Sequence, residues 1–316
     1  MFIEKELGYK RHWINIDSDI ISEQSYLYTK YDIDQETIEY ALDKNERAHM
    51  DYNRENGTIT FIYNVLALEK DKEHYETIPL TFIVQDTRLV TISNEDNAYV
   101  ISKMQDYVDN HEDLSIYKLL FAGLEMISNA YYPVIERLDQ QKDEVSRRLR
   151  QTTTSKNLYD LSDLETGMVY LVAAATQNRL LLEHIKGHAI YRRLNEVEKE
   201  QFDDAMIEAR QLVAMTDLIS KVLQQLSGSY NNILNNNLNN NLSNLTIIEV
   251  LLGVLAVITG FFGMNVPLPF MTVSPAWIFI IIGSVILCLV LARYLRRLVH
   301  RYLLVSAPVF SNCRRF

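Results

Sequence analysis

Short hydrophobic runs alternate with polar stretches over the first third of the chain. The clearest runs, rich in Ile, Val, Thr and Phe, are 59–68, 78–84 and 88–93. β-Branched and aromatic residues in runs of this length indicate β-strands. The sequence therefore predicts a mixed α/β module over residues 1–116.

The hydrophobic pattern changes near residue 117. Apolar residues then recur at spacings of three and four, as in IYKLLFAGLEMISNAYYPVIERL and GMVYLVAAATQNRLLLEHI, which is the period of an amphipathic helix. Thr152–Ser155 has the composition of a loop between two helices. We expect a helical hairpin over residues 117–194 that packs with the α/β module.

A stretch without proline begins near Asn195 and continues beyond residue 260, with 227–229 (Ser-Gly-Ser) as its interior break candidate. As one helix it would extend about 100 Å at 1.5 Å per residue. Its asparagine-rich part, 230–245, also fits a low-complexity linker, because asparagine is a mediocre helix former. Regularly spaced leucines in this part favour a helix whose apolar face suits bundling with further copies of the chain. The sequence predicts a stalk helix over 195–264 that continues into an apolar segment.

Two apolar segments near the end of the chain are long enough to span a membrane. The first, 246–264, contains a single charge, and the second, 275–295, is uncharged before Arg293. Two such segments so close together argue against buried helices of a soluble core. The loop between them, 265–274, is uncharged, whereas the tail, 296–316, is basic.

Arginines set the expected orientation of the two spans. Arg293, Arg296, Arg297 and Arg301 follow the second segment, and basic residues are retained on the cytoplasmic side. Two spans return the N-terminus to the same side, and the opening segment lacks the apolar core of a signal peptide. We expect a multi-pass protein of the cytoplasmic membrane, in contact with lipid, with both termini in the cytoplasm.

Charge and motifs narrow the function classes. Residues 1–245 hold 40 of the 41 acidic and 25 of the 31 basic residues, a formal charge near −15. This negative charge repels nucleic acid, which we therefore exclude as a partner, and it attracts cations. A general need for solubility explains the excess of acidic residues equally well. We find no nucleotide-binding loop, no HExxH spacing and no nucleophile motif. We therefore expect neither an enzyme nor an organic cofactor. Cys288 and Cys313 suggest no disulfide framework.

The motif Gly263-Met264-Asn265 closes the first apolar segment. Together with the short loop, the second segment and the basic tail, it resembles the CorA family of magnesium transport proteins. Asn239 falls where the family carries a pore-lining asparagine, and Asp204 falls where the family carries a regulatory aspartate.

The resemblance implies a homopentameric Mg²⁺ channel whose pore is lined by the first span. One span per subunit cannot enclose a path, so a closed ring of subunits is required. Mg²⁺ gives up its water reluctantly, and a ring of Asn265 amide oxygens would accept hydrogen bonds from the hydrated ion. Gly263 would permit close backbone approach, and Met264 would pack against neighbouring helices. These three residues form the expected selectivity filter.

A pore-lining stripe can be projected from Asn239 and Asn265 at 3.6 residues per turn. Its leucines would form an apolar gate, and its small residues would leave width for a hydrated ion, although small residues also serve helix packing. Glu249 would either add a cation-attracting ring or reach water at the membrane boundary. The predicted pore-lining residues are Asn239, Leu242, Leu245, Thr246, Glu249, Gly253, Ala256 and Gly260.

The resemblance also implies closure by internal Mg²⁺ bound between adjacent cytoplasmic domains. Asp204 is the best candidate ligand, helped by Asp203 and by Glu208 one turn along. The charged segment 69–76 could supply an acidic partner, and a solvated helix face is the alternative explanation for all three residues. We thus expect Mg²⁺ both as transported ion and as regulator.

Two departures from the family pattern leave the ion preference open. The outer loop VPLPFMTVSPA lacks the carboxylate that commonly follows the motif, and Gly228 stands where some relatives carry an aspartate. Co²⁺, Ni²⁺ or Zn²⁺ is the alternative cargo, although the predicted pore offers no Cys or His ligand and so favours a hard ion. A membrane-anchored sensor or scaffold that conducts nothing is the alternative from a different class.

Overall fold

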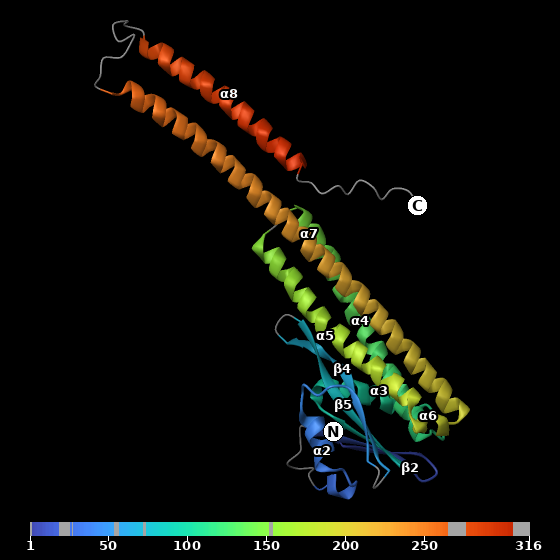
Figure 1. Cartoon of the computed structure of the whole chain (residues 1–316). Helices are drawn as coiled ribbons and strands as arrows, with labels where there is room; N and C mark the ends of the chain where they lie inside the picture. The colour runs from blue at the N-terminus through green and yellow to red at the C-terminus, as the bar shows by residue number, and fades with distance from the viewer. Residues whose placement is uncertain are drawn as a thin grey trace, which may run out of the picture. The chain divides into compact units, whose positions relative to one another are not determined.

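The structure, a computed structural model, divides the chain into two compact units, Met1–Ser229 and Tyr230–Phe316 (Figure 1). It describes residues 2–18, 26, 28–53, 57–71, 74–151, 154–264 and 276–305, without the side chains of 276–277 and 299–305. Asn265, the rest of the predicted loop 265–274 and the end of the basic tail lie outside the described residues.

A six-stranded sheet forms the base of the first unit. Its order is β1-β2-β6-β5-β4-β3, with β2 parallel to β6 and the other neighbours antiparallel. The strands are β1 (Ile3–Gly8), β2 (Arg11–Asp17), β3 (His49–Tyr52), β4 (Ile59–Asp71), β5 (His74–Gln85) and β6 (Arg88–Ser93). The three predicted strands are confirmed as the central strands β4, β5 and β6.

The helices that follow the sheet in the sequence cover one of its faces, as Figure 1 shows, whereas α2 lies between β2 and β3 in the sequence. The hairpin predicted from residue 117 is formed by α4 and α5, and the predicted stalk is α7, which continues without interruption through residues 227–229 and the asparagine-rich part. The helices are α2 (Gln35–Leu42), the 3-10 helix η2 (Glu95–Asn97), α3 (Ala98–Asp109), α4 (Ile116–Gln151), α5 (Ser155–Gly187), α6 (Ala189–Arg193), α7 (Glu196–Phe262) and α8 (Ala276–Val305).

Both faces of the sheet are buried. On one face, Ile14, Ile83 and Val90 form part of a hydrophobic cluster against which Ile38 of α2 packs. On the other, Gly123 of α4 comes so close to the sheet and α3 that an added Cβ would lie 3.1 Å from the Met104 sulfur and 3.4 Å from the Phe82 ring. The glycine therefore allows α4 to pack tightly against α3 and β5.

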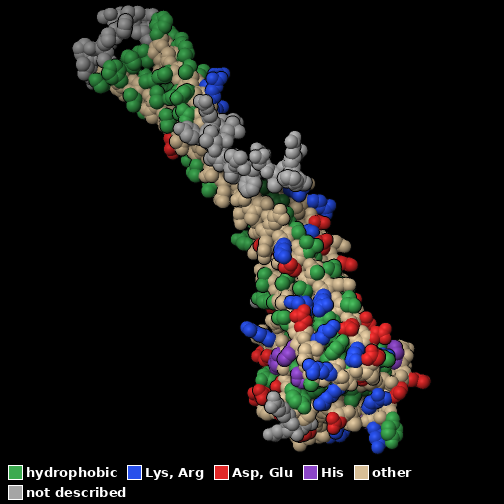
Figure 2. Space-filling model, turned by 45° about the vertical axis from the view of Figure 1, so that its right-hand side comes forward, with side chains coloured by type: hydrophobic (Ala, Val, Ile, Leu, Met, Phe, Trp, Pro, Cys, Tyr) green, Lys and Arg blue, Asp and Glu red, His purple; other side chains and the backbone are tan. Residues whose placement is uncertain are grey.

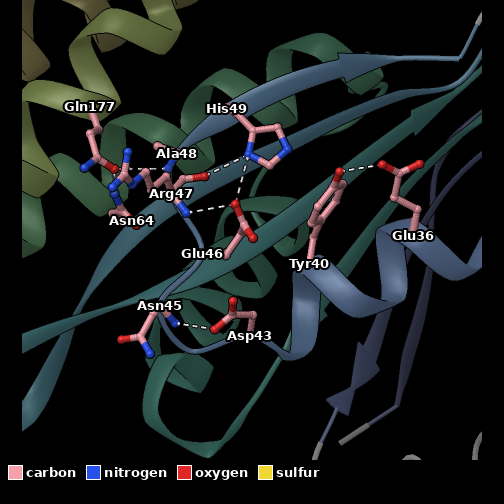
Figure 3. Close-up of polar contacts among 10 residues, drawn as sticks. All are labelled: Glu36, Tyr40, Asp43, Asn45, Glu46, Arg47, Ala48, His49, Asn64 and Gln177. Carbon is pink, nitrogen blue, oxygen red and sulfur yellow. Dashed lines mark hydrogen bonds and ion pairs between the residues drawn. The ribbon is translucent and has the colours of Figure 1, made fainter.

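A buried polar joint fastens α5 to the sheet. The Asn64 backbone N–H donates to Asn178 Oδ1 at 2.8 Å, and Asn178 Nδ2 donates back to the Asn64 carbonyl at 2.8 Å. Gln177 Oε1 accepts from Asn64 Nδ2 at 3.0 Å and from the Ala48 N–H at 3.2 Å (Figure 3). The Tyr131 hydroxyl of α4 adds a bond to the Asn64 carbonyl at 2.9 Å. One residue of β4 is thus held by α4 and α5 together.

The second unit contains the end of α7 and α8. Within the described residues, α7 and the segment Ile278–Leu298 are long and apolar enough to cross a membrane, and 6% of each apolar window is buried. Figure 2 shows hydrophobic side chains gathered over this unit and charged ones over the first. The low burial is the opposite of that in a soluble core helix. α8 continues to Val305, ten residues past the predicted end at 295, because the arginine-rich sequence after it remains a good helix former.

Candidate ion pathway and acidic cluster

One stripe of α7 is covered within the second unit. Ile247 is 7% exposed, and Ser243, Leu251, Val254 and Ile258 are half-buried at spacings of three and four residues. This is the repeat of one helix face. Since α8 is the other described helix of the unit, this stripe is the face that packs toward α8.

The predicted pore-lining residues lie on a different face of α7. All eight are exposed in the single chain, with Leu242 at 51% and Leu245 at 52%. At 100° per residue, the centre of their stripe is turned from Ile247 by roughly 140°. The helix therefore presents the centre of this stripe away from its contact with α8.

Three residues at one edge of this exposed face also border a groove beside α8. Asn239, Leu242 and Thr246 line it together with Leu295 of α8. Glu249 does not line the groove, and among the described residues it forms no ion pair. The predicted pore-lining residues thus share one side of α7. Asn239, Leu242 and Thr246 lie at the edge of that side, beside α8.

The small residues of the stripe face open space. A Cβ added at Gly253 or Gly260 would meet nothing within 4 Å in the single chain. Neither glycine is needed for the packing of α7 on α8. The packing of the single chain therefore gives no reason for small residues at these two positions.

The helix α7 ends at Phe262, directly before the predicted filter motif. The Gly263 N–H donates to the Thr259 carbonyl at 2.9 Å, and the Met264 N–H donates to the Phe261 carbonyl at 3.5 Å. The Met264 side chain is 45% exposed in the single chain. Gly263 and Met264 therefore form a turn directly after the helix, which ends at Phe262, and Asn265 lies outside the described residues.

The predicted regulatory residues separate into two groups. Asp203 pairs with Lys186 of α5 at 3.2 Å. Glu208 instead accepts a hydrogen bond from the Tyr132 hydroxyl of α4 at 2.8 Å, and Asp204 is exposed. Asp204 and Glu208, one turn apart on α7, therefore face α4, whereas Asp203 faces α5.

Glu125 of α4 joins this group. Gln201 Nε2 donates to it at 2.6 Å, and its pKa is raised by burial, then by the charge of Asp204 and also by that of Glu208. The three carboxylates, which we call the acidic cluster, consist of Glu125, Asp204 and Glu208. Carboxylate oxygens are the ligands preferred by Mg²⁺, so the cluster fits a hard cation in its donor chemistry.

The acidic cluster is incomplete as a metal site within one chain. Among the described residues, no group of three His, Cys, Asp or Glu side chains could hold a metal ion by itself. The described residues of the segment 69–76 lie at the paired ends of β4 and β5, and there His74 stacks on Tyr170 of α5 with ring centroids 5.4 Å apart.

Sequence reasoning missed Glu125. The available signal was a lone carboxylate within the apolar run 116–135 of the predicted hairpin. Such a residue is unusual in a buried helix face unless a partner satisfies it. Its proximity to Asp204, almost eighty positions away in the sequence, required the structure.

Comparison with known proteins agrees with this architecture. The family model described as "CorA-like Mg2+ transporter protein" matches residues 10–297. Comparison with curated proteins gave no match. Among solved structures, the complete CorA magnesium transporter from Methanocaldococcus jannaschii is similar to this chain at a TM-score of 0.78 and 20% identity. The match covers 92% of this chain and 91% of the transporter chain.

Two further structures share the fold. Full-length CmaX matches 90% of this chain and 88% of its own length at a TM-score of 0.68 and 14% identity. The ZntB cytoplasmic domain from Vibrio parahaemolyticus matches 74% of this chain and 98% of its own length at a TM-score of 0.55 and 9% identity. At these identities the similarity shows the fold alone.

A sheet-containing unit, a long helix and two C-terminal apolar helices define the chain as a two-span membrane protein. Because the family match extends over residues 10–297, the chain belongs to the CorA-like Mg²⁺ transporter family. This membership supports transport of a divalent cation across a membrane, and a transporter rather than an enzyme.

Proposed function

We propose that this chain is the subunit of a homopentameric channel that carries hydrated Mg²⁺ across the cytoplasmic membrane, with both termini in the cytoplasm. The observation that carries the proposal is the exposed face of α7. In a chain of this family, the eight residues projected as pore-lining are all exposed, and the centre of their stripe is turned away from the side of α7 that packs toward α8. Five copies arranged in a ring would give this face a common axis.

Selection would take place at the outer end of this face. A ring of Asn265 amides offers neutral oxygens to the water shell of the ion, so Mg²⁺ need not be stripped of water it releases reluctantly. Gly263 and Met264 would set the backbone and packing of that ring. Further in, Leu242 and Leu245 would form an apolar constriction that closes by dewetting.

Cytoplasmic Mg²⁺ would regulate the channel through the acidic cluster. Glu125 is already destabilised as an anion by Asp204 and Glu208, and a divalent cation would relieve that repulsion. Because the part of one chain that the structure describes does not group three such ligands, a neighbouring copy would complete the site. Asp203, paired with Lys186, would contribute through the net charge of the region. Binding between copies would stabilise one state of a two-state switch.

Flux through reconstituted protein tests the proposed function. Liposomes containing the wild-type protein should take up Mg²⁺, and Asn265→Ala should reduce uptake by about tenfold or more, because the ring of hydrogen-bond acceptors for the hydrated ion is lost. Uptake of Co²⁺, Ni²⁺ and Zn²⁺ by the same vesicles decides between cargoes. Protein that assembles fully but moves none of these ions would be the sensor or scaffold instead.

Inhibition by internal Mg²⁺ tests the regulatory site. Asp204→Ala should raise the Mg²⁺ concentration needed for half inhibition by about tenfold, within the usual range of allosteric coupling, while maximal flux is retained. Glu200→Ala, which removes another exposed carboxylate of α7, is the matched control and should leave inhibition unchanged. Equal inhibition of wild type and Asp204→Ala would reject the assignment.

A further inference from the structure

The loop end of the α4–α5 hairpin has a charge opposite to that of the unit carrying it. Residues 145–159 contain four basic residues and no acidic one, whereas residues 1–245 as a whole are near −15. We call the described part of this segment, 145–151 and 154–159, the hairpin tip. Arg147, Arg150 and Lys156 are exposed there.

The positive charge of the hairpin tip is not neutralised locally. Three carboxylates next to this segment in the sequence lie against other cations: Asp160 pairs with Arg148 at 2.8 Å, Asp143 pairs with Lys142 at 3.3 Å, and Glu144 lies 4.0 Å from Arg148. Among the described residues, Arg147, Arg150 and Lys156 form no ion pair. The hairpin tip therefore carries three exposed cations, and Tyr159 in the same segment is 71% exposed.

Contacts along α5 show at which end of the first unit the tip lies. Lys186 pairs with Asp203 at 3.2 Å, Glu183 lies 4.0 Å from Arg210, and Glu165 hydrogen-bonds Ser227. The two helices therefore run antiparallel, and the beginning of α5 lies beside the last part of α7 in this unit.

The tip extends beyond this point in the direction in which α7 leaves the first unit. From Glu165 back to Ser155, α5 continues for about 15 Å at 1.5 Å per residue. Along the chain, the first apolar segment begins at Thr246, 19 residues after Ser227. The basic tip is thus at the end of the first unit from which the chain proceeds to the membrane.

We propose that the hairpin tip docks on the phosphate groups of anionic lipids at the membrane surface that the chain spans. A negatively charged leaflet attracts basic side chains over about a Debye length, roughly 8–10 Å. Arg147, Arg150 and Lys156 supply the charge, and Tyr159 supplies a ring suited to the headgroup level. Docking would hold α5, and α7 through α5, at a fixed distance from the bilayer.

A fluorescent label on the tip of the full chain reports docking. With Cys288 and Cys313, the chain's two cysteines, replaced by alanine, Gln151→Cys carries the label in nanodiscs that contain nitroxide-headgroup lipid. We expect quenching in discs rich in phosphatidylglycerol and little in pure phosphatidylcholine. High salt should reverse it. Each cation removed from the tip should lower the docked-to-free ratio by about fivefold.

Three comparisons make the experiment decisive. Arg147→Gln/Arg150→Gln/Lys156→Gln should abolish quenching, whereas Lys103→Gln/Arg192→Gln/Arg193→Gln, which removes equal charge from other exposed sites of the first unit, should not. A label at Glu112→Cys, near the opposite end of α4, should remain unquenched.

Quenching that ignores lipid charge, or that survives the triple substitution at the tip, overturns the proposal. The proposal is also overturned if the triple substitution changes the fluorescence of the tip label in lipid-free detergent, because the three cations would then contact protein instead of lipid. Wild-type Mg²⁺ uptake by the cysteine-free protein is measured separately, so failure of docking and failure of transport are distinguishable.

Discussion

At Glu125, burial and two neighbouring carboxylates raise the pKa of a side chain in the middle of a helix. The folded protein therefore binds this proton more tightly than the unfolded chain does. The cost of ionising Glu125 is absent below the unfolded pKa, appears as the pH rises through the raised folded pKa, and is fully present above it.

Glu125→Gln should accordingly stabilise the protein more at neutral pH than in acid. We expect the Tm difference between variant and wild type to be larger at about pH 7 than near pH 4, where both states are protonated. Thermal unfolding in detergent with a chelator present measures this, because divalent cations would mask the repulsion.

Glu136→Gln is the matched control for this experiment, since it removes an exposed glutamate from the same helix. It should change Tm little at either pH. A Tm difference for Glu125→Gln that does not depend on pH would show that the repulsion within the acidic cluster is unimportant for stability.

Residue types and spacing predicted that the regulatory residues on α7 lie near one another, but not which helix each of them faces. The expected regulatory residues lie on one stretch of α7, so their proximity followed from sequence distance alone. Asp203 nevertheless faces Lys186, whereas Asp204 and Glu208 face α4, a difference of one helical position that depends on how the helices pack. Glu125 could not be assigned without that packing.

At the scale of elements, the buried joint between Asn64 and Asn178 fixes where α5 sits on the sheet. Asn178→Leu has a similar volume but leaves a backbone N–H of β4 without its partner. Loss of buried hydrogen bonds of this kind costs about 2–3 kcal/mol, which should lower Tm by roughly 5–10 °C in a unit of this size.

Thermal unfolding of the full-length protein checks the effect of Asn178→Leu. Asn129→Leu makes the same chemical change at an exposed position of α4 and should leave Tm nearly unchanged. If both variants unfold at the wild-type temperature, the joint does not contribute to stability as its geometry suggests.

Elements with strong local patterns were predictable from the sequence, and those defined by long-range pairing were not. The strands β4 to β6 are dense in β-branched and aromatic residues, and α7 has an uninterrupted apolar period. β1 and β2 are short and carry charged residues such as Lys5 and Arg11, and β2 acquires its place by pairing in parallel with β6. The asparagine-rich part of α7 is helical because its leucines keep the helical period despite weak intrinsic propensity.

At the scale of the whole molecule, the exposed face of α7 is meaningful only in an assembly. A single chain leaves large apolar side chains of this helix uncovered, among them Leu242 and Leu245. Lipid would cover such a face as readily as a pore or another subunit would. The projection from Asn239 and Asn265 therefore predicts a face that is exposed in the single chain, and a substitution is needed to distinguish a pore from lipid at that face.

Gly253 and Gly283 provide that distinction, because both lie in apolar helices and a Cβ at either would meet nothing within 4 Å of the single chain. Leucine is a better helix former than glycine by about 1 kcal/mol, so neither Gly253→Leu nor Gly283→Leu should disrupt its helix. If Gly253 lines the pore, five leucine side chains would form a hydrophobic constriction, and Mg²⁺ flux should fall by about tenfold or more. Gly283→Leu on α8 should conduct normally.

The comparison requires that both variants assemble like the wild type, which light scattering after size-exclusion chromatography establishes. Gly253→Leu that assembles and still conducts at the wild-type rate would place this face toward lipid, and the path of the ion would then have to follow another side of α7. Loss of flux in Gly253→Leu alone would instead assign the ion path to the face that carries Glu249, Gly253 and Ala256. The gate at Leu242 and Leu245 would then lie on the same path, because all five residues share that face.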